Sequence, residues 1–178
     1  IVYLLMLNFE NNKEKIMSKP TLSAVGEKDV PETKDAREFY RRLEADVLAR
    51  TIWGEARGEG LEGMRAVANV IINRVKIAEL KNGFWWGNNI IQVCQKPYQF
   101  SCWTRSDPNF KKLQAVDETD IYFASALRIA RRILINRLDD NTSGSTHYHA
   151  KSISPYWSRG EEPCAHIGSH TFYKLVGG

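Results

Sequence analysis

An acidic residue, Glu55, occupies a position in the stretch WGEARGE where a helix would ordinarily bury an apolar side chain. Leu48, Ile52 and Glu55 are spaced at i, i+4 and i+7, which lines up one face of an α-helix. Glycines follow at once, so the helix should end near Arg57 with Glu55 in its last turn. The helix dipole and partial burial both disfavour the ionised carboxylate there, and we expect a raised pKa suited to a general acid. The alternative is a helix that frays into a solvated turn.

A second group of polar and aromatic residues lies in the stretch YQFSCW. Tyr98, Gln99, Ser101 and Trp103 could line a groove, because flat rings stack on sugar faces while amides and hydroxyls hydrogen-bond sugar hydroxyls. The alternative is a hairpin of the hydrophobic core, with Phe100 buried.

Histidines alternate with tyrosine in the stretch THYHA. In a strand, His147 and His149 share one face and Tyr148 takes the other. Two such histidines could hold a metal, with His166 or His170 completing the set, as in a metal-dependent amidase or peptidase. No acidic ligand stands at a recognisable spacing, however, so we expect polar groove walls, no metal and no cofactor.

The stretch HIGSHTFYKL brings further candidates near the end of the chain. His170 and Tyr173 could reach a substrate site. Packing of Phe172 and Leu175 is the alternative purpose of this segment.

Three helical patterns must position these groups. Residues 34–57 carry one apolar face, residues 61–78 a second and residues 120–137 a third. The three faces consist of Phe39, Leu43, Val47, Leu48 and Ile52; of Met64, Val67, Ala68, Ile71 and Val75; and of Phe123, Leu127, Ala130 and Leu134. Residues 81–110 read as an irregular region or small hairpin, and a polar loop over 152–168 divides two strands. The sequence therefore predicts an α+β fold, mainly helical and lysozyme-like, with a small β-hairpin or sheet region.

Composition limits the partners. The 178 residues are 43% hydrophobic with a net charge of +4, and the basic residues are spread along the chain, so we expect a globular protein that does not bind nucleic acid. The apolar run IVYLLMLNF is too short for a membrane span and lacks the marks of a signal peptide. We expect no stable membrane insertion, a poorly ordered N-terminal extension over residues 1–34, and a catalytic domain over residues 35–178.

Five separated motifs resemble those of the SleB-type cell wall hydrolases, a family of spore cortex-lytic enzymes and phage lysins: IWGEARGEGLEGMRAVANVIINRV, YQFSCW, GSTHYHA, PYW and IGSHTFY. The likeness spans residues 45–175. It implies a lysozyme-like fold and cleavage of the β-1,4 bond between N-acetylmuramic acid and N-acetylglucosamine, with the family's catalytic glutamate at Glu55. The spore enzymes are richer in tyrosine where this chain has HYH, and we recognise no peptidoglycan-binding repeat in the residues before the expected domain. A phage-type lysin or wall-remodelling enzyme therefore fits better than a spore-cortex role.

Glycoside hydrolysis normally uses two carboxylates. Asp107, Asp117, Glu59 and Glu62 are available, but none has the sequence context of a nucleophile. A single acid suffices if the muramoyl 6-hydroxyl is the nucleophile, so we expect a lytic transglycosylase with Glu55 as sole general acid and base. The alternatives are a hydrolytic N-acetylmuramidase, the histidine-ligated amidase or peptidase, and a wall-binding module without turnover.

The expected substrate is the glycan strand of peptidoglycan, bound by a monomer. Gln99, Ser101 and Tyr148 should orient the sugar, with help from His149 or His170. The enzyme should act on the bacterial wall, in the periplasm or outside the cell. Because the sequence shows no clear export signal, we expect cytoplasmic synthesis followed by phage-type release.

Overall fold

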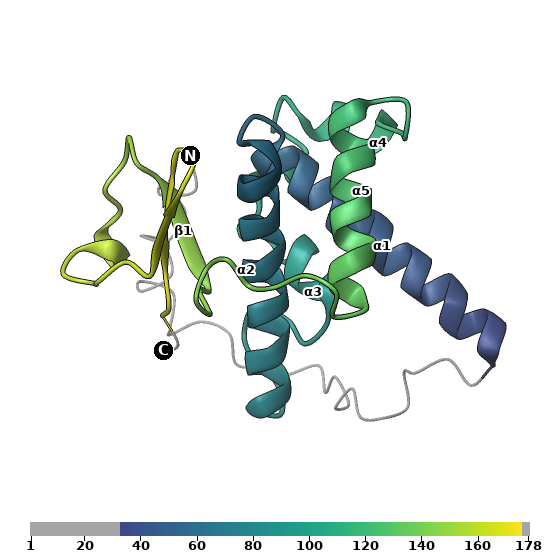
Figure 1. The fold of residues 1–178 in the computed structure, drawn as a ribbon, viewed down its shortest axis with the longest axis horizontal. Helices are drawn as coiled ribbons and strands as arrows, with labels where there is room; N and C mark the ends of the chain where they lie inside the picture. Colours follow the sequence, from purple (N-terminus) through teal and green to yellow (C-terminus); the bar gives the residue numbers. More distant parts are fainter. Residues whose placement is uncertain (1–32, 176–178) are drawn as a thin grey trace, which may run out of the picture.

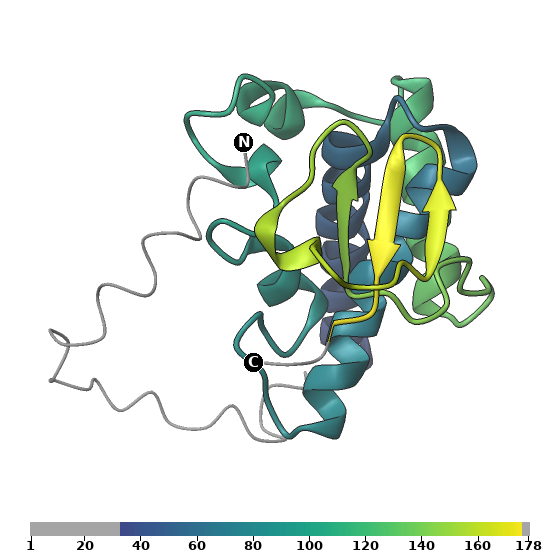
Figure 2. The ribbon, with the colours of Figure 1, turned by 90° about the vertical axis from the view of Figure 1, so that its left-hand side faces the viewer.

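The computed structural model describes residues 33–175, which form a helical layer with a small sheet on one side (Figure 1). The elements are α1 (Lys34–Ala56), α2 (Gly60–Leu80), α3 (Ile90–Gln95), the 3₁₀ helix η4 (Ser101–Trp103), α4 (Phe110–Ala115), α5 (Ile121–Leu134), β1 (His147–Ala150), the 3₁₀ helix η5 (Tyr156–Ser158), β2 (Ala165–Ile167) and β3 (His170–Tyr173). Helices α1 and α5 pack on one side of α2, and the sheet lies on its other side (Figure 2). The predicted α+β class is confirmed.

Side-chain caps fix where two of the long helices begin. Thr33 Oγ1 accepts a hydrogen bond from the backbone N–H of Ala36, at 3.1 Å. The Asp120 carboxylate accepts from the N–H groups of Tyr122 and Phe123, both at 2.9 Å. These bonds satisfy donors that the first turn of a helix leaves without an internal partner.

The predicted helix faces are confirmed in the middle of the domain and wrong at one end. Phe39 and Leu43, which we expected in the core, are 68% and 41% exposed. The first turns of α1 extend past α2 and α5, so none of the other helices among residues 33–175 covers their apolar side (Figure 1). Of the other predicted core positions, Val75 and Leu134 are half-buried and the rest are buried: Val47, Leu48, Ile52, Met64, Val67, Ala68, Ile71, Phe123, Leu127 and Ala130.

The region predicted as irregular or as a hairpin contains two short helices, α3 and η4, and α4 begins at its last residue, so the hairpin prediction is wrong. Asn89 caps α3 by accepting a hydrogen bond from the N–H of Gln92. Phe100 is buried, as expected, but it precedes the turn of η4 rather than lying in a strand. Cys102 in η4 packs directly against Gly54 of α1. The region is therefore held by contacts with distant helices that its own sequence does not show.

The sheet is antiparallel in the order β1-β3-β2, with β3 in the centre. Tyr148 of β1 is paired with Phe172 of β3, and Phe172 packs on Ala66 and Val70 of α2. The expected strands at THYHA and HTFYKL are confirmed, but β2 falls within the predicted loop over 152–168. The chain reverses between β2 and β3 at Gly168, which has a φ of +57°.

Two predictions concern the ends of the domain and the membrane. Residues 1–32 of the expected N-terminal extension lie outside the described residues, and the division of the chain at residue 35 stays a prediction. Between residues 33 and 175, none of the helices combines the length and the apolar character that crossing a bilayer requires.

We predict that Gly54→Ala destabilises the protein. A Cβ at this position would lie 2.7 Å from Cys102 Cβ and 2.8 Å from its Sγ, which is closer than these atoms can pack. Overpacking of this kind costs about 1–3 kcal/mol, which exceeds the roughly 1 kcal/mol that alanine gains over glycine within a helix. Denaturant unfolding measures the difference.

Gly58→Ala is the matched control, because nothing lies within 4 Å of a Cβ there. We expect it to unfold at or slightly above the wild-type denaturant concentration. Equal stability of the Gly54 and Gly58 variants would contradict the close packing of η4 on α1.

Candidate active site

Glu55 lies in the last turn of α1, where side chains from two other elements reach its carboxyl group. Tyr148 of β1 donates its hydroxyl to Glu55 Oε2 at 2.9 Å. Cys102 of η4 donates both its thiol and its backbone N–H. The carboxyl group thus faces the interior between the helices and the sheet, as the spacing of Leu48, Ile52 and Glu55 predicted.

The surroundings of Glu55 act on its proton in opposite directions, and the net effect is a raised pKa. The largest cause is burial, because loss of water disfavours the charged form. The donors on Tyr148 and Cys102 lower the pKa, while the negative charge of Asp107 raises it. The residue keeps some contact with solvent, yet protein surrounds its carboxyl group densely enough for the loss of water to dominate.

A buried cation, Arg74 of α2, forms hydrogen bonds with two chain segments next to the site. Its side chain is 6% exposed and donates to the carbonyl of Thr146 at 2.8 Å and to Gln99 Oε1 at 2.7 Å. Burial lowers the pKa of Arg74 to about 10, so it remains charged at neutral pH. Its charge also favours the ionised forms of Tyr148 and Glu55.

Arg74 therefore fixes two of the elements that border the site. Through Thr146 it holds the chain just before β1, and through Gln99 it holds the chain just before η4. The sequence analysis did not identify Arg74. The available signal was a lone arginine within the apolar run NVIINRV, which is unusual unless its charge is paired by buried acceptors.

Glu59 forms a bridge from the turn after α1 to the turn between β2 and β3. Its carboxylate accepts from the N–H of Ser169 at 2.7 Å and from Ser169 Oγ at 2.6 Å. A side chain at Gly168 would collide with this carboxylate. The two hydrogen bonds from Ser169 lower the pKa of Glu59, so it is a carboxylate at neutral pH.

The same bridge brings His170 to the site. Its ring meets the Tyr148 ring edge-on, with centroids 5.1 Å apart, and its Nδ1 is 3.8 Å from the Glu59 carboxylate. Burial lowers the pKa of His170, against the attraction of Glu59, so its neutral form is favoured at pH 7. A chain of contacts thus runs from Glu59 through His170 and Tyr148 to Glu55.

Three predicted substrate-binding residues lie on the other face of the sheet. His147 and His149 both contact Trp157, with ring centroids 5.4 and 5.5 Å away. Tyr173 stacks on His149 and meets Trp157 edge-on. Because Tyr148 points to α2 and its neighbours in β1 point away, these rings form a separate aromatic surface rather than a wall beside Glu55.

The remaining predicted residues form no hydrogen bond with Glu55. Ser101 directly precedes Cys102, and Gln99 is held by Arg74. Trp103 packs against the core and donates its indole N–H to Thr51, at 2.9 Å. Tyr98 is 57% exposed.

The four other candidate carboxylates all accept hydrogen bonds from neighbouring residues. Asp107 is the only one of the four whose charge affects Glu55, and it accepts a hydrogen bond from the N–H of Asn109 at 2.7 Å. The other three are occupied by partners of their own: Asp117 by Thr119, Glu62 by Arg65, and Glu59 by Ser169.

No group of three or more histidine, cysteine or acidic residues suitable for a metal ion occurs in the part of the chain that the structure describes. Both ring nitrogens of His149 are engaged, one with the Ala150 carbonyl and the other with the Tyr173 hydroxyl. His147 Nδ1 is engaged with Thr146 Oγ1. The geometry gives the metal-dependent alternative no support.

We predict that Glu59→Gln lowers stability in a pH-dependent way. Ser169 donates to both carboxylate oxygens, and glutamine replaces one of them with an NH₂ group that cannot accept, so at pH 7 we expect a loss of about 1–3 kcal/mol. The folded-state pKa of Glu59 lies below its ordinary value of 4.5, so the wild-type advantage is complete above that value. It disappears as the pH falls through the folded-state pKa, and unfolding at pH 7 and pH 3 measures the change.

Glu38→Gln is the control, because Glu38 forms an exposed pair with Arg42 on the surface of α1. Such pairs contribute about 0–1 kcal/mol. A Glu59 variant no less stable than this control at pH 7 would argue against the bridge.

Comparisons with known proteins identify the family of the chain. A family model described as Cell Wall Hydrolase matches residues 58–173, and Glu55 lies just before this span. A spore cortex-lytic enzyme of Bacillus subtilis (strain 168) is 27% identical over 128 residues, which are 71% of this chain and 36% of that protein. A spore cortex-lytic enzyme of Halalkalibacterium halodurans is 28% identical over 136 residues, 75% of this chain and 35% of that protein. The chain thus spans about a third of the length of these relatives.

Solved structures share the fold. The catalytic domain of the Bacillus cereus SleB protein aligns with a TM-score of 0.57 at 23% identity, covering 84% of this chain and 99% of that one. The catalytic domain of the germination-specific lytic transglycosylase SleB of Bacillus anthracis aligns with a TM-score of 0.54 at 25% identity, covering 74% and 93%. The predicted resemblance to the SleB-type family is confirmed. Since the family model matches more than half of the sequence, the chain belongs to the cell wall hydrolase family.

Proposed function

We propose that this domain degrades peptidoglycan by cleaving the β-1,4 bond between N-acetylmuramic acid and N-acetylglucosamine. Glu55 carries the proposal, because it is an acid with a raised pKa that donors on Tyr148 and Cys102 hold in place. Family membership and the spore cortex-lytic relatives support a peptidoglycan substrate. The net charge of +4 favours capture of an anionic wall.

The proposed reaction is that of a lytic transglycosylase. Protonated Glu55 gives its proton to the bridging oxygen as the bond to C1 of the muramoyl unit breaks. The resulting Glu55 carboxylate is stabilised by the hydrogen bonds from Tyr148 and Cys102. It then takes the proton of the muramoyl 6-hydroxyl while that oxygen bonds to C1, which closes the 1,6-anhydro ring and restores the acid.

The arrangement of the other carboxylates supports this route over hydrolysis. A retaining hydrolase needs a second carboxylate as nucleophile, and an inverting one needs a carboxylate that activates water. Asp107 is the candidate for either role, since it is the one whose charge affects Glu55. It is hydrogen-bonded to the chain before α4, however, and the transglycosylase route does not need it.

Several finer assignments belong to the same proposal. We assign orientation of the sugar to Gln99, which precedes η4, and to Ser101 in η4, and we assign orientation of Glu55 to Tyr148. Because Arg74 occupies the Gln99 side-chain oxygen, the Gln99 amide NH₂ is left to donate to the substrate. The proposed partner is a single glycan strand, and the proposed place of action is the bacterial wall.

We predict that Glu55→Gln folds normally and loses activity. Glutamine keeps the shape of the side chain and can still accept the Tyr148 hydrogen bond, but it cannot supply a proton. Because general acid–base catalysis contributes roughly 10²- to 10⁴-fold, we expect at least a hundredfold loss in the rate of lysis of purified peptidoglycan.

Glu118→Gln is the matched control, since Glu118 is an exposed residue paired with Arg131. It should lyse peptidoglycan at the wild-type rate. Substantial lysis by a folded Glu55→Gln variant would remove the proposed acid.

We further predict that wild-type digestion of purified peptidoglycan yields anhydromuramoyl ends. No water is added in the proposed reaction, so each fragment that ends in anhydromuramic acid is lighter by one water than the corresponding product of hydrolysis. Mass spectrometry of the soluble fragments makes the distinction. Reducing muramoyl ends would instead assign the chain to the hydrolytic muramidases, with Asp107 as the next residue to substitute.

Release of peptide amino groups without glycan cleavage would point to the amidase or peptidase alternative. Sedimentation with sacculi and no released fragments would point to a wall-binding module. Both outcomes contradict the proposed function.

A further inference from the structure

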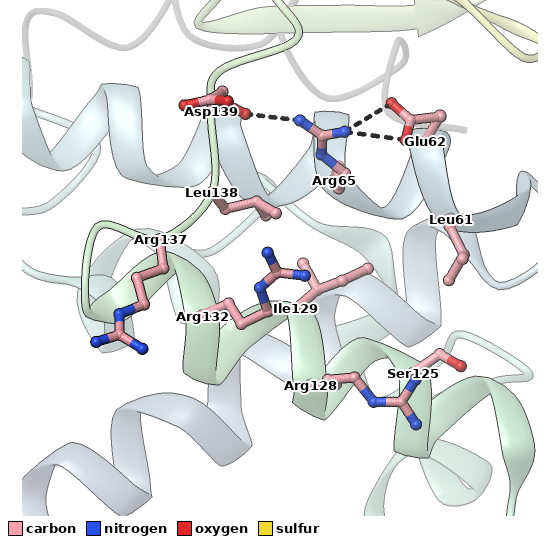
Figure 3. A pocket seen from close by; sticks show the side chains of 10 residues that line it. All are labelled: Leu61, Glu62, Arg65, Ser125, Arg128, Ile129, Arg132, Arg137, Leu138 and Asp139. Carbon is pink, nitrogen blue, oxygen red and sulfur yellow. Dashed lines mark hydrogen bonds and ion pairs between the residues drawn. The ribbon is translucent and has the colours of Figure 1, made fainter.

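A hollow with no residue in common with the Glu55 site lies between the first turns of α2 and the length of α5 (Figure 3). Its volume is about 360 Å³. The residues that line it are Leu61, Glu62, Arg65, Ser125, Arg128, Ile129, Arg132, Arg137, Leu138 and Asp139. The proposed catalytic reaction uses none of them.

Three of the four lining arginines have no partner of their own. The guanidinium groups of Arg128, Arg132 and Arg137 form no hydrogen bond or ion pair with the residues between 33 and 175. Arg132 extends from α5 toward α2, and Arg128 lies beside Ser125, while Arg137 is turned outward (Figure 3). Free donors and positive charge are therefore available at the hollow.

Arg65, the fourth, is already held. It donates to both carboxylate oxygens of Glu62, at 3.0 and 3.1 Å, and to the carbonyl of Asp139 at 3.1 Å. Its Nε is buried without a partner. Four arginines and two carboxylates line the hollow, so it carries an excess of two positive charges, centred on the free arginines.

Apolar side chains form the rest of the lining. Ile129 is nearly buried and Leu138 half-buried, while Leu61 is 60% exposed. On a helix face that only contacts water, we would not expect apolar side chains to lie between the arginines. Arg131 of the same helix shows the ordinary arrangement, since it lies outside the hollow and pairs with Glu118 on the surface.

We propose that this hollow binds a short acidic peptide, namely the peptide stem of peptidoglycan. Arginine forks match carboxylates in geometry and charge, and the apolar surface suits small side chains such as the methyl group of alanine. Peptide stems combine alanine with carboxylate-bearing residues. The proposal rests on the proposed function for its source of peptide, and it adds a second contact with the same polymer.

Such a second contact has a physical consequence for activity on whole walls. Two weak sites that bind one polymer act at a high effective concentration, so the combined binding exceeds that of either site. The stem site should therefore matter for intact sacculi and not for glycan strands that lack peptide.

The test is calorimetric binding of the free stem tripeptide L-alanyl-γ-D-glutamyl-meso-diaminopimelate to the full chain. We expect Arg132→Gln to weaken binding roughly tenfold or more, because it removes a charged hydrogen-bond donor. The matched control is Arg131→Gln, which removes an equal charge from the adjacent position of α5 but from outside the hollow. It should bind the tripeptide as the wild type does.

Further measurements distinguish binding at this hollow from non-specific attraction between charges and from binding at the active site. The tripeptide with its carboxylates amidated should bind weakly to the wild type. Arg132→Gln should cleave peptide-free glycan strands at the wild-type rate and intact sacculi more slowly. Equal loss of binding in the Arg131 and Arg132 variants, or tight binding of the amidated peptide, would overturn the proposal.

Two more outcomes decide between ligand classes and between the two proposals. Binding of duplex DNA or inorganic phosphate that depends on Arg132, with no binding of tripeptide, would overturn the assignment to a peptide. If the wild type binds the tripeptide but does not cleave glycan strands, the proposed function is refuted and the proposed peptide site is still supported.

Discussion

The hydrogen bond between Tyr148 and Glu55 is the contact on which the rest of the site depends. It joins residues that lie 93 positions apart, one at the end of α1 and the other in β1. It forms only if the sheet docks on α2, which the packing of Phe172 on Ala66 and Val70 achieves. The apolar contact between sheet and helix thus determines the chemistry of a carboxyl group that belongs to neither.

Burial and hydrogen bonding act in opposite directions on the pKa of Glu55. Burial alone would keep Glu55 protonated and make its anion costly, whereas hydrogen bonds alone would keep it ionised. Tyr148 and Cys102 supply the bonds, and the packed surroundings supply the loss of water. A group that must give up a proton and then recover one needs both states to be accessible, and this combination provides them.

Arg74 is a buried positive charge near Glu55, and its hydrogen bonds offset the cost of burying it. A desolvated cation is expensive unless its donors are used, and Arg74 uses them on the Thr146 carbonyl and on Gln99. Its guanidinium also lies over the rings of Trp86 and Phe100. The arginine thereby ties α2 to the chain segments that carry Tyr148 and Cys102.

Much of the helical frame could be predicted from sequence, because its signal is periodic. The spacing of Leu48, Ile52 and Glu55 indicated the inward face of α1, and glycines indicated where α1 ends. The exposed Phe39 and Leu43 have the same spacing, and only the ends of neighbouring helices decide that they remain uncovered. Periodicity shows which side of a helix is apolar, but it does not show how far the partner extends.

The parts that sequence did not predict depend on distant contacts. Strand β2 is three residues long with an exposed histidine in the middle, so it has no pattern to read. The role of Glu59 depends on Ser169, which is 110 positions away. The alternation in β1 did predict that His147 and His149 share a face, but only the docked sheet shows that this face is turned away from Glu55 and toward Trp157.

That alternation makes the chemistry sensitive to the length of one short segment. Side chains along a strand change faces with every residue, so a shift of β1 by one position against β3 would exchange its two surfaces. An imidazole would then meet the carboxyl group of α1, and the tyrosine ring would join the aromatic surface at Trp157. The gain or loss of a single residue in the loop before Thr146 would therefore exchange the two surfaces of β1 and dismantle the site.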